Sequence, residues 1–452
     1  MTEHQNHQAQ DLINFINLSP SPYHAAANVV ETLENAGYQL YDGRSKLDSG
    51  DKKYVLRGGS SVFAFSVGKK ALKTGFRMVA SHTDAPGLKI KPQSLIRQAN
   101  CLCLNTEVYG GPILHTWFDR TLSMAGQVAL KTGDVWKPDI RLINFIRPVL
   151  LIPSLAIHMH RDVNEVNAIQ KAKSLLPVIG LDSYQDSDCN QKIDDSIDAV
   201  KEKGTGLHYS SPNDFESILA HEMGVAKEDI LDYSLFLFDT APACLAGLNQ
   251  ELISAPRLDN LGMVHASMNA LLEADEQDGI NLIACFDHEE IGSRTRQGAS
   301  SSALRDIMES IIYGLGGNRT DFLSCMDTSF LLSADQAHAV HPNYQEAADQ
   351  TNQPKINQGP VLKTSASQSY LTDARSMATF RQLCREADVT CQVFAARSDK
   401  RSGSTVGPLT VEKVPVCGVD IGNPIWAMHA IRETGGAADQ EAMIKVMKQF
   451  FS

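Results

Sequence analysis

The feature that most constrains this chain is an apolar run, Leu282 to Phe286, followed almost at once by two adjacent glutamates, Glu289 and Glu290. Such a run predicts a buried strand. Carboxylates beside a core need a partner, such as a metal ion, because burying an uncompensated charge is costly. Adjacent side chains on a strand point to opposite faces, so both glutamates reach one site only if the chain bends, which Gly292 allows. From this stretch alone, a solvated strand end with two surface glutamates is an equally good interpretation.

The same arrangement, an apolar strand followed by polar donors, recurs along the chain. His82 and Asp84 follow a predicted strand at 76–80, Asp335 follows one at 329–333, and His429 comes after one at 416–422. In open α/β sheets, sites form at the carboxyl ends of strands. A single histidine after a strand, however, is more often a structural residue. Asp259 stands where a helix through 264–271 would begin, so taken alone it is best explained as a helix N-cap.

The length and local patterning of the chain predict two domains. A chain of 452 residues exceeds what one hydrophobic core usually serves. Ser21 and Pro22 predict a helix start, and a strand is expected at 60–68. Between about residues 91 and 232, short alternating segments broken by Gly and Pro predict an antiparallel β module. Within that module, Asp182 to Gly206 is polar and predicts a solvated, mobile loop.

Composition and charge narrow the class of partner. The chain carries 41 basic and 53 acidic residues, a net charge of −12, which argues against binding to nucleic acid. No apolar run has the length of a membrane span, and the polar N-terminus lacks the features of a secretory signal. The nine cysteines are an odd number and are scattered, so we expect free thiols in a reducing cytoplasm.

Taken together, these donors form a set that suits a pair of divalent ions. It consists of two imidazoles and several carboxylates: His82, Asp259, Glu289, Glu290, Asp335 and His429. Two zinc-like ions about 3.5–4 Å apart can polarise a carbonyl, generate hydroxide and bind a free amine. That is the chemistry of an aminopeptidase.

Three other functions remain open at this point. A dinuclear amidohydrolase or deacylase acting on a small N-acyl compound would use the same ligands. A non-catalytic, self-assembling metal-binding scaffold would be expected to lack Glu289, which is present. A nucleotide-binding α/β enzyme would need a Gly-x-Gly-x-x-Gly motif after a strand or a P-loop, and the sequence contains neither.

Five long motifs, in order, carry a resemblance to a known family. They are Ser81-His82-Thr83-Asp84, Ala255-Pro256-Arg257-Leu258-Asp259-Asn260, Asp287-His288-Glu289-Glu290-Ile291-Gly292-Ser293, the segment from Ser333 to Tyr344, and Ala427-Met428-His429-Ala430-Ile431-Arg432-Glu433. With them the chain closely resembles the aspartyl aminopeptidases, the M18 family of metallopeptidases, and in particular its bacterial members. The resemblance covers almost the whole chain.

The resemblance implies a ligand set for two Zn²⁺ ions per subunit, with Co²⁺ or Mn²⁺ also suited to it. His82 and Asp335 would hold one ion, Glu290 and His429 the other, and Asp259 would bridge them.

It also implies roles for the residues around the ions. Asp84 would orient His82, and Glu289 would be the general base that takes a proton from a bridging water and passes it to the leaving amine. The peptide bond between Asp259 and Asn260 is expected to be cis, as in related enzymes.

The architecture implied is a zinc-peptidase α/β/α sandwich of the phosphorylase/hydrolase-like kind. It would comprise residues 1–90 and 233–452 and be interrupted by a β-rich oligomerisation domain at 91–232. The resemblance further implies a homo-oligomer, either a dimer or a dodecamer.

The expected substrates are peptides with a free N-terminus, preferentially beginning with Asp or Glu. Lys363 and Tyr370 match positions that line the first substrate pocket in the family, and His158 matches a histidine that reaches a neighbouring active site. An aminopeptidase of neutral specificity is the alternative, because bacterial members vary in how strictly they demand acidic residues.

Overall fold

The computed structural model describes residues 3–165, 168–182, 212, 214–275, 277–400 and 403–452. Within these limits the chain divides into two compact units. The first comprises residues 1–87, 109–116 and 241–452, and the second comprises residues 88–108 and 117–240. From the sequence we predicted that the inserted domain ends at residue 232, whereas the second unit ends at residue 240. The prediction also did not assign residues 109–116 to the first unit. The loop that the sequence predicts at 182–206 lies outside the described residues from residue 183 onward.

The first unit is built on a nine-stranded mixed sheet with strand order β1-β2-β3-β13-β4-β14-β18-β16-β17. Its strands are β1 Gln39–Leu40, β2 Lys52–Arg57, β3 Ser61–Val67, β4 Phe76–His82, β13 Ile280–Phe286, β14 Phe330–Ala334, β16 Val361–Thr364, β17 Gln392–Ala395 and β18 Cys417–Gly422. The central strands β13, β4, β14 and β18 run parallel to one another. The predicted strands at 60–68, 76–80, 329–333 and 416–422 are all present, within one or two residues.

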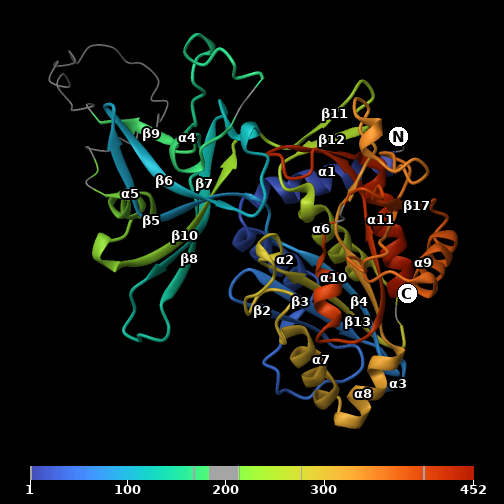
Figure 1. The fold of residues 1–452 in the computed structure, drawn as a ribbon. Coiled ribbons are helices and arrows are strands. Elements are labelled where there is room, and N and C mark those ends of the chain that lie inside the picture. The colour runs from blue at the N-terminus through green and yellow to red at the C-terminus, as the bar shows by residue number, and fades with distance from the viewer. Residues whose placement is uncertain (1–2, 166–167, 183–211, 213, 276, 401–402) are drawn as a thin grey trace, which may run out of the picture. The chain divides into compact units, whose positions relative to one another are not determined.

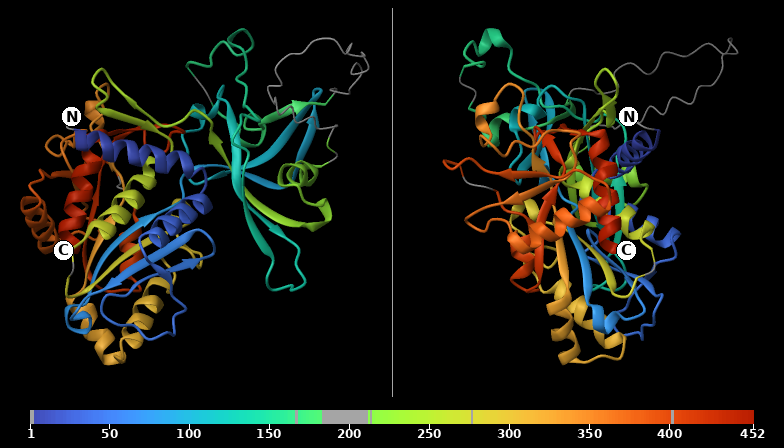
Figure 2. Two further views of the ribbon diagram at one scale, coloured as in Figure 1. Left: turned by 180° about the vertical axis from the view of Figure 1, so that it is seen from behind. Right: turned by 90° about the vertical axis from the view of Figure 1, so that its right-hand side faces the viewer.

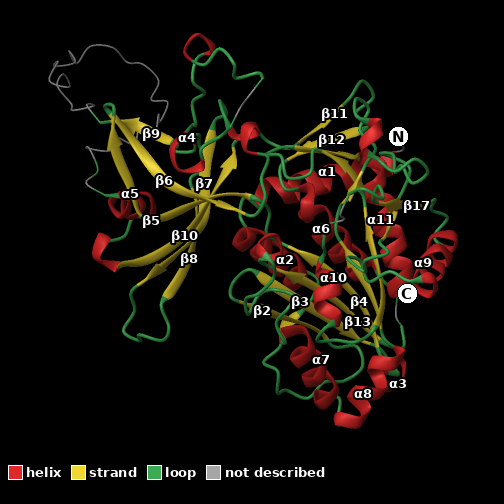
Figure 3. Cartoon of the chain, in the orientation of Figure 1, coloured by secondary structure: helices red, strands yellow, loops and turns green. Residues whose placement is uncertain are grey.

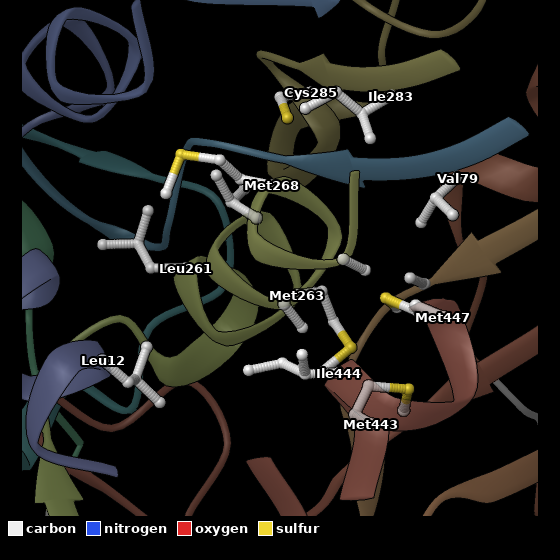
Figure 4. Close-up of a cluster of buried hydrophobic side chains, with 14 of the residues drawn as sticks. Leu12, Val79, Leu261, Met263, Met268, Ile283, Cys285, Met443, Ile444 and Met447 are labelled. Carbon is white, nitrogen blue, oxygen red and sulfur yellow. The ribbon is translucent and has the colours of Figure 1, made fainter. Parts of the chain in front are cut away.

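Strand β13 is buried along its whole length because both faces of the sheet are covered. Ile283 and Cys285 point into one core, part of which Figure 4 shows together with methionines of α6 and α11. Leu282, Ala284 and Phe286 alternate into a second core on the opposite face. An apolar run without polar interruptions is the pattern expected of such a doubly covered strand.

Helices form the two outer layers of this unit, which makes it an α/β/α sandwich (Figures 1 and 2). The first core is covered by α1 Glu3–Leu18, α2 Pro22–Asn35, α6 Leu258–Glu273, α9 Ala374–Glu386 and α11 Ala437–Phe451. The second core is covered by α7 Ala303–Gly314, α8 Arg319–Thr328 and α10 Val406–Val411, with the short helix α3 Ala71–Thr74 at its edge. Helix α2 begins as predicted, with Ser21 as its N-cap and Pro22 at its first position.

A smaller five-stranded sheet, with order β11-β12-β20-β19-β15, completes the first unit. Its strands are β11 Cys244–Ala246, β12 Leu252–Ala255, β15 Ala337–His338, β19 Pro424–Trp426 and β20 Glu433–Gly436. Strands β12 and β20 pair antiparallel, with Ala255 opposite Glu433. This sheet therefore ties together the segments that carry Asp259, Asp335 and His429.

The second unit contains a six-stranded sheet with order β8-β7-β10-β5-β6-β9, and strands dominate it in Figure 3. They are β5 Gly87–Gln98, β6 Cys101–Tyr109, β7 Leu122–Leu130, β8 Asp139–Asn144, β9 Val178–Leu181 and β10 Ile230–Asp239. Short helices α4 Lys171–Ser174 and α5 Phe215–Met223 and the 3-10 turns η2 Ile157–Met159 and η3 Lys227–Asp229 complete it. In the described part of the chain, no helix combines the length and apolarity needed to cross a bilayer.

Candidate metal centre and active site

The candidate site lies at the carboxyl edge of the nine-stranded sheet. His82 is the last residue of β4 and pairs in register with Phe286, the last residue of β13. Asp335 directly follows β14, which is the other parallel neighbour of β4. Because these strands are adjacent and parallel, the donors that follow them converge, as the sequence predicted from strand ends.

The two glutamates lie on a tight turn rather than on a strand. Glu289 to Ile291 forms the 3-10 turn η4, flanked by His288 at φ 63° and Gly292 at φ 93°. This is the bend that allows adjacent side chains to serve one site. Ligand atoms of Glu289, Glu290 and His82 lie within 4.8 Å of one another.

Asp259 does not cap helix α6, so the N-cap explanation of this residue is wrong. The backbone of Asp259 is non-helical, at a kink near the start of α6, and its Oδ1 accepts no hydrogen bond from any described residue. Its carboxylate instead lies 3.5 Å from Nε2 of His82 and 3.4 Å from Nε2 of His429. The Asp259–Asn260 peptide bond is cis, as the resemblance implied.

Asp259 joins two groups of potential ligands, one at each oxygen. Around Oδ1, His82 Nε2 lies 3.5 Å away and is itself 3.6 Å from Asp335 Oδ1. Around Oδ2, His429 Nε2 lies 3.4 Å away and is itself 3.4 Å from Glu290 Oε1. The structure therefore brings together all five residues that the resemblance assigns as metal ligands.

These separations fit coordination better than hydrogen bonding. They exceed the usual hydrogen-bond length of about 2.7–3.2 Å. Bonds of about 2.0–2.2 Å to a tetrahedral ion would place neighbouring ligand atoms about 3.3–3.6 Å apart, which is the spacing found here. Asp259 Oδ1 and Glu290 Oε1 are also buried without a hydrogen-bond partner among the described residues. A cation in each ligand group would satisfy these two oxygens.

The histidines and Asp259 stabilise one another's charged forms. Burial would lower the pKa of His82, but its contacts with the carboxylates of Asp259, Asp335 and Asp84 raise it well above the usual value. Burial would raise the pKa of Asp259, but its contacts with His429 and His82 bring that pKa below its usual range.

In contrast to Asp259, the two glutamates have raised pKa values, so their charged forms are disfavoured. Burial raises the pKa of Glu289 to about 8, opposed by His82 and reinforced by the neighbouring aspartates. Burial and the charge of Asp259 raise the pKa of Glu290 well above its usual value. Carboxylates crowded into this site thus retain protons that a divalent ion would displace.

Asp84 holds the His82 side of the site in place. Its Oδ1 lies 3.3 Å from His82 Nδ1, and its carboxylate accepts the backbone N–H groups of Glu289 at 3.1 Å and Glu290 at 3.2 Å. The hydroxyl of Tyr109 donates to Asp84 Oδ2 at 2.7 Å. Sequence reasoning missed Tyr109, because no local pattern distinguishes the last residue of β6 from other strand tyrosines.

Glu433 is a second residue that sequence reasoning left without a role. It lies in the last of the quoted motifs, and its buried carboxylate accepts backbone N–H groups of Asp259 and His429. Burial raises the pKa of Glu433 to about 8, and the negative charge of Asp259 contributes. The only available signal was an acidic residue four positions after the predicted ligand His429.

Lys363 lies beside the site as a fully buried ammonium group. Its Nζ donates to the backbone oxygen of Gln336 at 3.0 Å, lies 3.8 Å from Asp335 Oδ2, and faces the Tyr370 ring at 5.4 Å from its centroid. Burial would lower the pKa of Lys363, but Asp335, Tyr370 and Asp420 more than compensate and raise it. His158 lies in the second unit on η2, where its side chain is exposed.

Comparison with known proteins identifies the family. The family model described as aminopeptidase I zinc metalloprotease (M18) matches residues 15–451. The chain belongs to the M18 family. It is 42% identical over 448 residues to the probable M18 family aminopeptidase 2 of Clostridium acetobutylicum, covering 98% of both chains. This M18 chain is therefore a metalloaminopeptidase.

Solved structures of M18 proteins share the fold. A chain in the cryo-EM structure of the Ape4 and Nbr1 complex matches with a TM-score of 0.90 at 35% identity, covering 100% of this chain and 87% of that one. The S. cerevisiae mApe1 dodecamer matches with a TM-score of 0.81 at 25% identity, covering 99% and 97%.

Proposed function

We propose that this M18 aminopeptidase removes N-terminal Asp or Glu from peptides at a site that holds two divalent ions. The observation that supports it best is the division of Asp259 between two ligand groups, with Oδ1 near His82 and Oδ2 near His429. One group is completed by Asp335 and the other by Glu290.

The donor set fits zinc. Imidazole nitrogen and carboxylate oxygen are common zinc ligands, although cobalt and manganese also suit them. Bound divalent ions would act as Lewis acids on the scissile carbonyl and lower the pKa of a water molecule.

Glu289 is the group placed to move protons. Its carboxyl lies within 4.8 Å of potential ligand atoms of His82 and Glu290 without belonging to the two groups that share Asp259. Burial raises its pKa to about 8 in the metal-free protein, and bound divalent ions would lower that pKa so that the carboxylate is ionised and able to accept a proton. Glu289 would take a proton from the attacking water and return it to the leaving amine. Asp84 would hold Glu289 in place by accepting a hydrogen bond from the backbone N–H of Glu289.

Lys363 would supply the preference for acidic residues. An ammonium group that stays charged while buried is a strong partner for a substrate carboxylate. Its contacts with Gln336 and Tyr370 fix its direction, and Tyr370 in turn packs edge-on against Phe394, with ring centroids 6.5 Å apart.

The second unit would serve in assembly. We expect a homo-oligomer, a dimer or a dodecamer, because the similar mApe1 structure is a dodecamer. Side chains such as Trp136, Ile146 and Met159, which are exposed in the isolated chain, would be buried between subunits. The exposed His158 would reach a neighbouring subunit's active site.

The experiment that tests the proposal compares α-Asp-, α-Glu-, Leu- and Lys-p-nitroanilide as substrates, with and without chelator and added Zn²⁺ or Co²⁺. We expect chelator-sensitive release from the acidic substrates only. Preference for Leu or Lys would contradict the Lys363 assignment while leaving the metal site intact. Activity that persists after complete metal removal would overturn the proposed chemistry.

A further inference from the structure

Glu433 connects two backbone segments that are far apart in the sequence. Its Oε1 accepts the backbone N–H of His429 at 2.7 Å, and its Oε2 accepts the backbone N–H of Asp259 at 2.9 Å. The side chain is almost fully buried, with 2% of its surface exposed. One carboxylate thus holds the main chain of two residues from the same candidate half-site.

The segment that carries His429 needs such support. Ala427 and His429 both have left-handed backbone angles, with φ of 56° and 69°. These conformations are unfavourable for residues with a Cβ. The bond from His429 N–H to Glu433, four residues later, closes this turn and counters its tendency to relax.

An ionised carboxylate offers one acceptor oxygen to each of the two N–H groups. Two N–H groups need two acceptors, and neither backbone donor can rotate to become an acceptor. A glutamine here would offer one oxygen and turn its NH₂ group toward the other N–H. The buried N–H left without an acceptor would cost about 1–3 kcal/mol.

We propose that Glu433 is a positioning residue that sets the cation affinity of the half-site formed by Asp259, Glu290 and His429. It does so by fixing the backbone from which two of these three ligands project. The inference rests on the proposed two-ion site. Asp84 plays a similar part beside the His82 half-site. It contacts the His82 ring and accepts hydrogen bonds from the backbone N–H groups of Glu289 and Glu290.

The test measures metal binding directly. Metal-free wild-type protein, Glu433→Gln and Glu433→Asp are titrated with Co²⁺ by equilibrium dialysis, while visible absorption reports the coordination of each ion. Glu441→Gln is the matched control, because Glu441 is also a largely buried glutamate but pairs with Lys445 on α11. Thermal melting of all four proteins reports stability separately.

We expect wild type and Glu441→Gln to bind two Co²⁺ ions. Glu433→Gln should keep the first ion and bind the second about 10–100-fold more weakly, the usual effect of losing a residue that supports a ligand. Glu433→Asp keeps the charge but is one methylene shorter. Its affinity for the second Co²⁺ ion should lie between those of wild type and Glu433→Gln. If Glu433→Gln does not fold, the weakening in Glu433→Asp decides.

Two results would overturn the inference. One is that Glu433→Gln or, if that variant does not fold, Glu433→Asp binds both ions with wild-type affinity and absorption. The other is the same unchanged Co²⁺ binding accompanied by a lower melting temperature, which would show that Glu433 stabilises the fold without affecting metal affinity. Failure of the wild type to bind two ions would instead overturn the proposed function.

Discussion

The two halves of the candidate metal centre are built differently. His82 and Asp335 come from the ends of adjacent parallel strands, and their side chains are only 1% and 11% exposed. Glu290 and His429 come from a 3-10 turn and a left-handed loop, and the His429 side chain is 31% exposed. Asp259 belongs to both halves.

This difference predicts unequal metal binding. Ligands on strands are held more rigidly than ligands on loops, and a buried half excludes competing water. We therefore expect the His82 half to bind its ion more tightly and to release it more slowly to a chelator. The His429 half would be the exchangeable position.

The largest effect should come from a residue outside both pairs. Glu289→Gln is expected to lower kcat by about 10²–10⁴-fold, because it removes the proposed general base. Both ions should remain bound, as measured by dialysis, and Glu441→Gln should retain activity. Loss of metal from Glu289→Gln would show that Glu289 is a ligand and not the base.

Removing one histidine at a time tests whether the two halves bind metal with unequal affinity. His82→Ala removes the imidazole that contacts both Asp335 and Asp259 and leaves each of these buried carboxylates with one cationic partner fewer, so it should lose metal and lower the melting temperature. His429→Ala should bind its ion more weakly but lose less stability, because water can reach that position. Titration with Zn²⁺ and thermal melting measure both. A greater loss of metal and stability in His429→Ala would reverse the comparison.

Substrate preference should depend on the His82 side, where Lys363 lies 3.8 Å from Asp335. Lys363→Met should lower kcat/KM for α-Glu-p-nitroanilide by about 10–150-fold, which corresponds to one charged hydrogen bond of about 1.5–3 kcal/mol. Leu-p-nitroanilide is the control substrate, and its hydrolysis should change little. Equal losses on both substrates would assign Lys363 a structural role beside Asp335.

The smallest effect concerns pH. Burial and the charge of Asp259 raise the pKa of Glu290, so in the metal-free protein this carboxyl keeps its proton to a higher pH than a free glutamate and must lose it to bind a cation. Zn²⁺ affinity should therefore rise with pH, by up to about tenfold per pH unit for each proton released. Calorimetry in buffers of different ionisation enthalpy would measure the release. His82 and His429, whose pKa values are also raised, must likewise lose their protons to bind a cation, so both halves should contribute and His429→Ala should reduce the dependence only in part.

The sequence predicted four of the five ligands, and for a physical reason. His82, Glu290, Asp335 and His429 all follow apolar runs, because a buried strand fixes where the next donor lies. The role of Asp259 could not be predicted locally, since an aspartate at a helix start usually caps it. Lys363 was assigned only through the resemblance.

Tyr109 and Glu433 depend on contacts that close only in the folded chain. Tyr109 meets Asp84 across 25 residues, and Glu433 meets Asp259 across 174. No periodicity or local motif encodes such pairs. The same limit explains the domain boundary, because β10 looks like a core strand but pairs with β7 of the second unit.

The most direct test of the two-ion account is stepwise reconstitution. Metal-free protein is titrated with Zn²⁺ while bound metal and hydrolysis of α-Glu-p-nitroanilide are measured in the same samples. We predict that the first equivalent binds with little activity and that activity rises with the second and levels off at two ions per chain. Full activity at one equivalent, with the second ion adding nothing, would contradict the account.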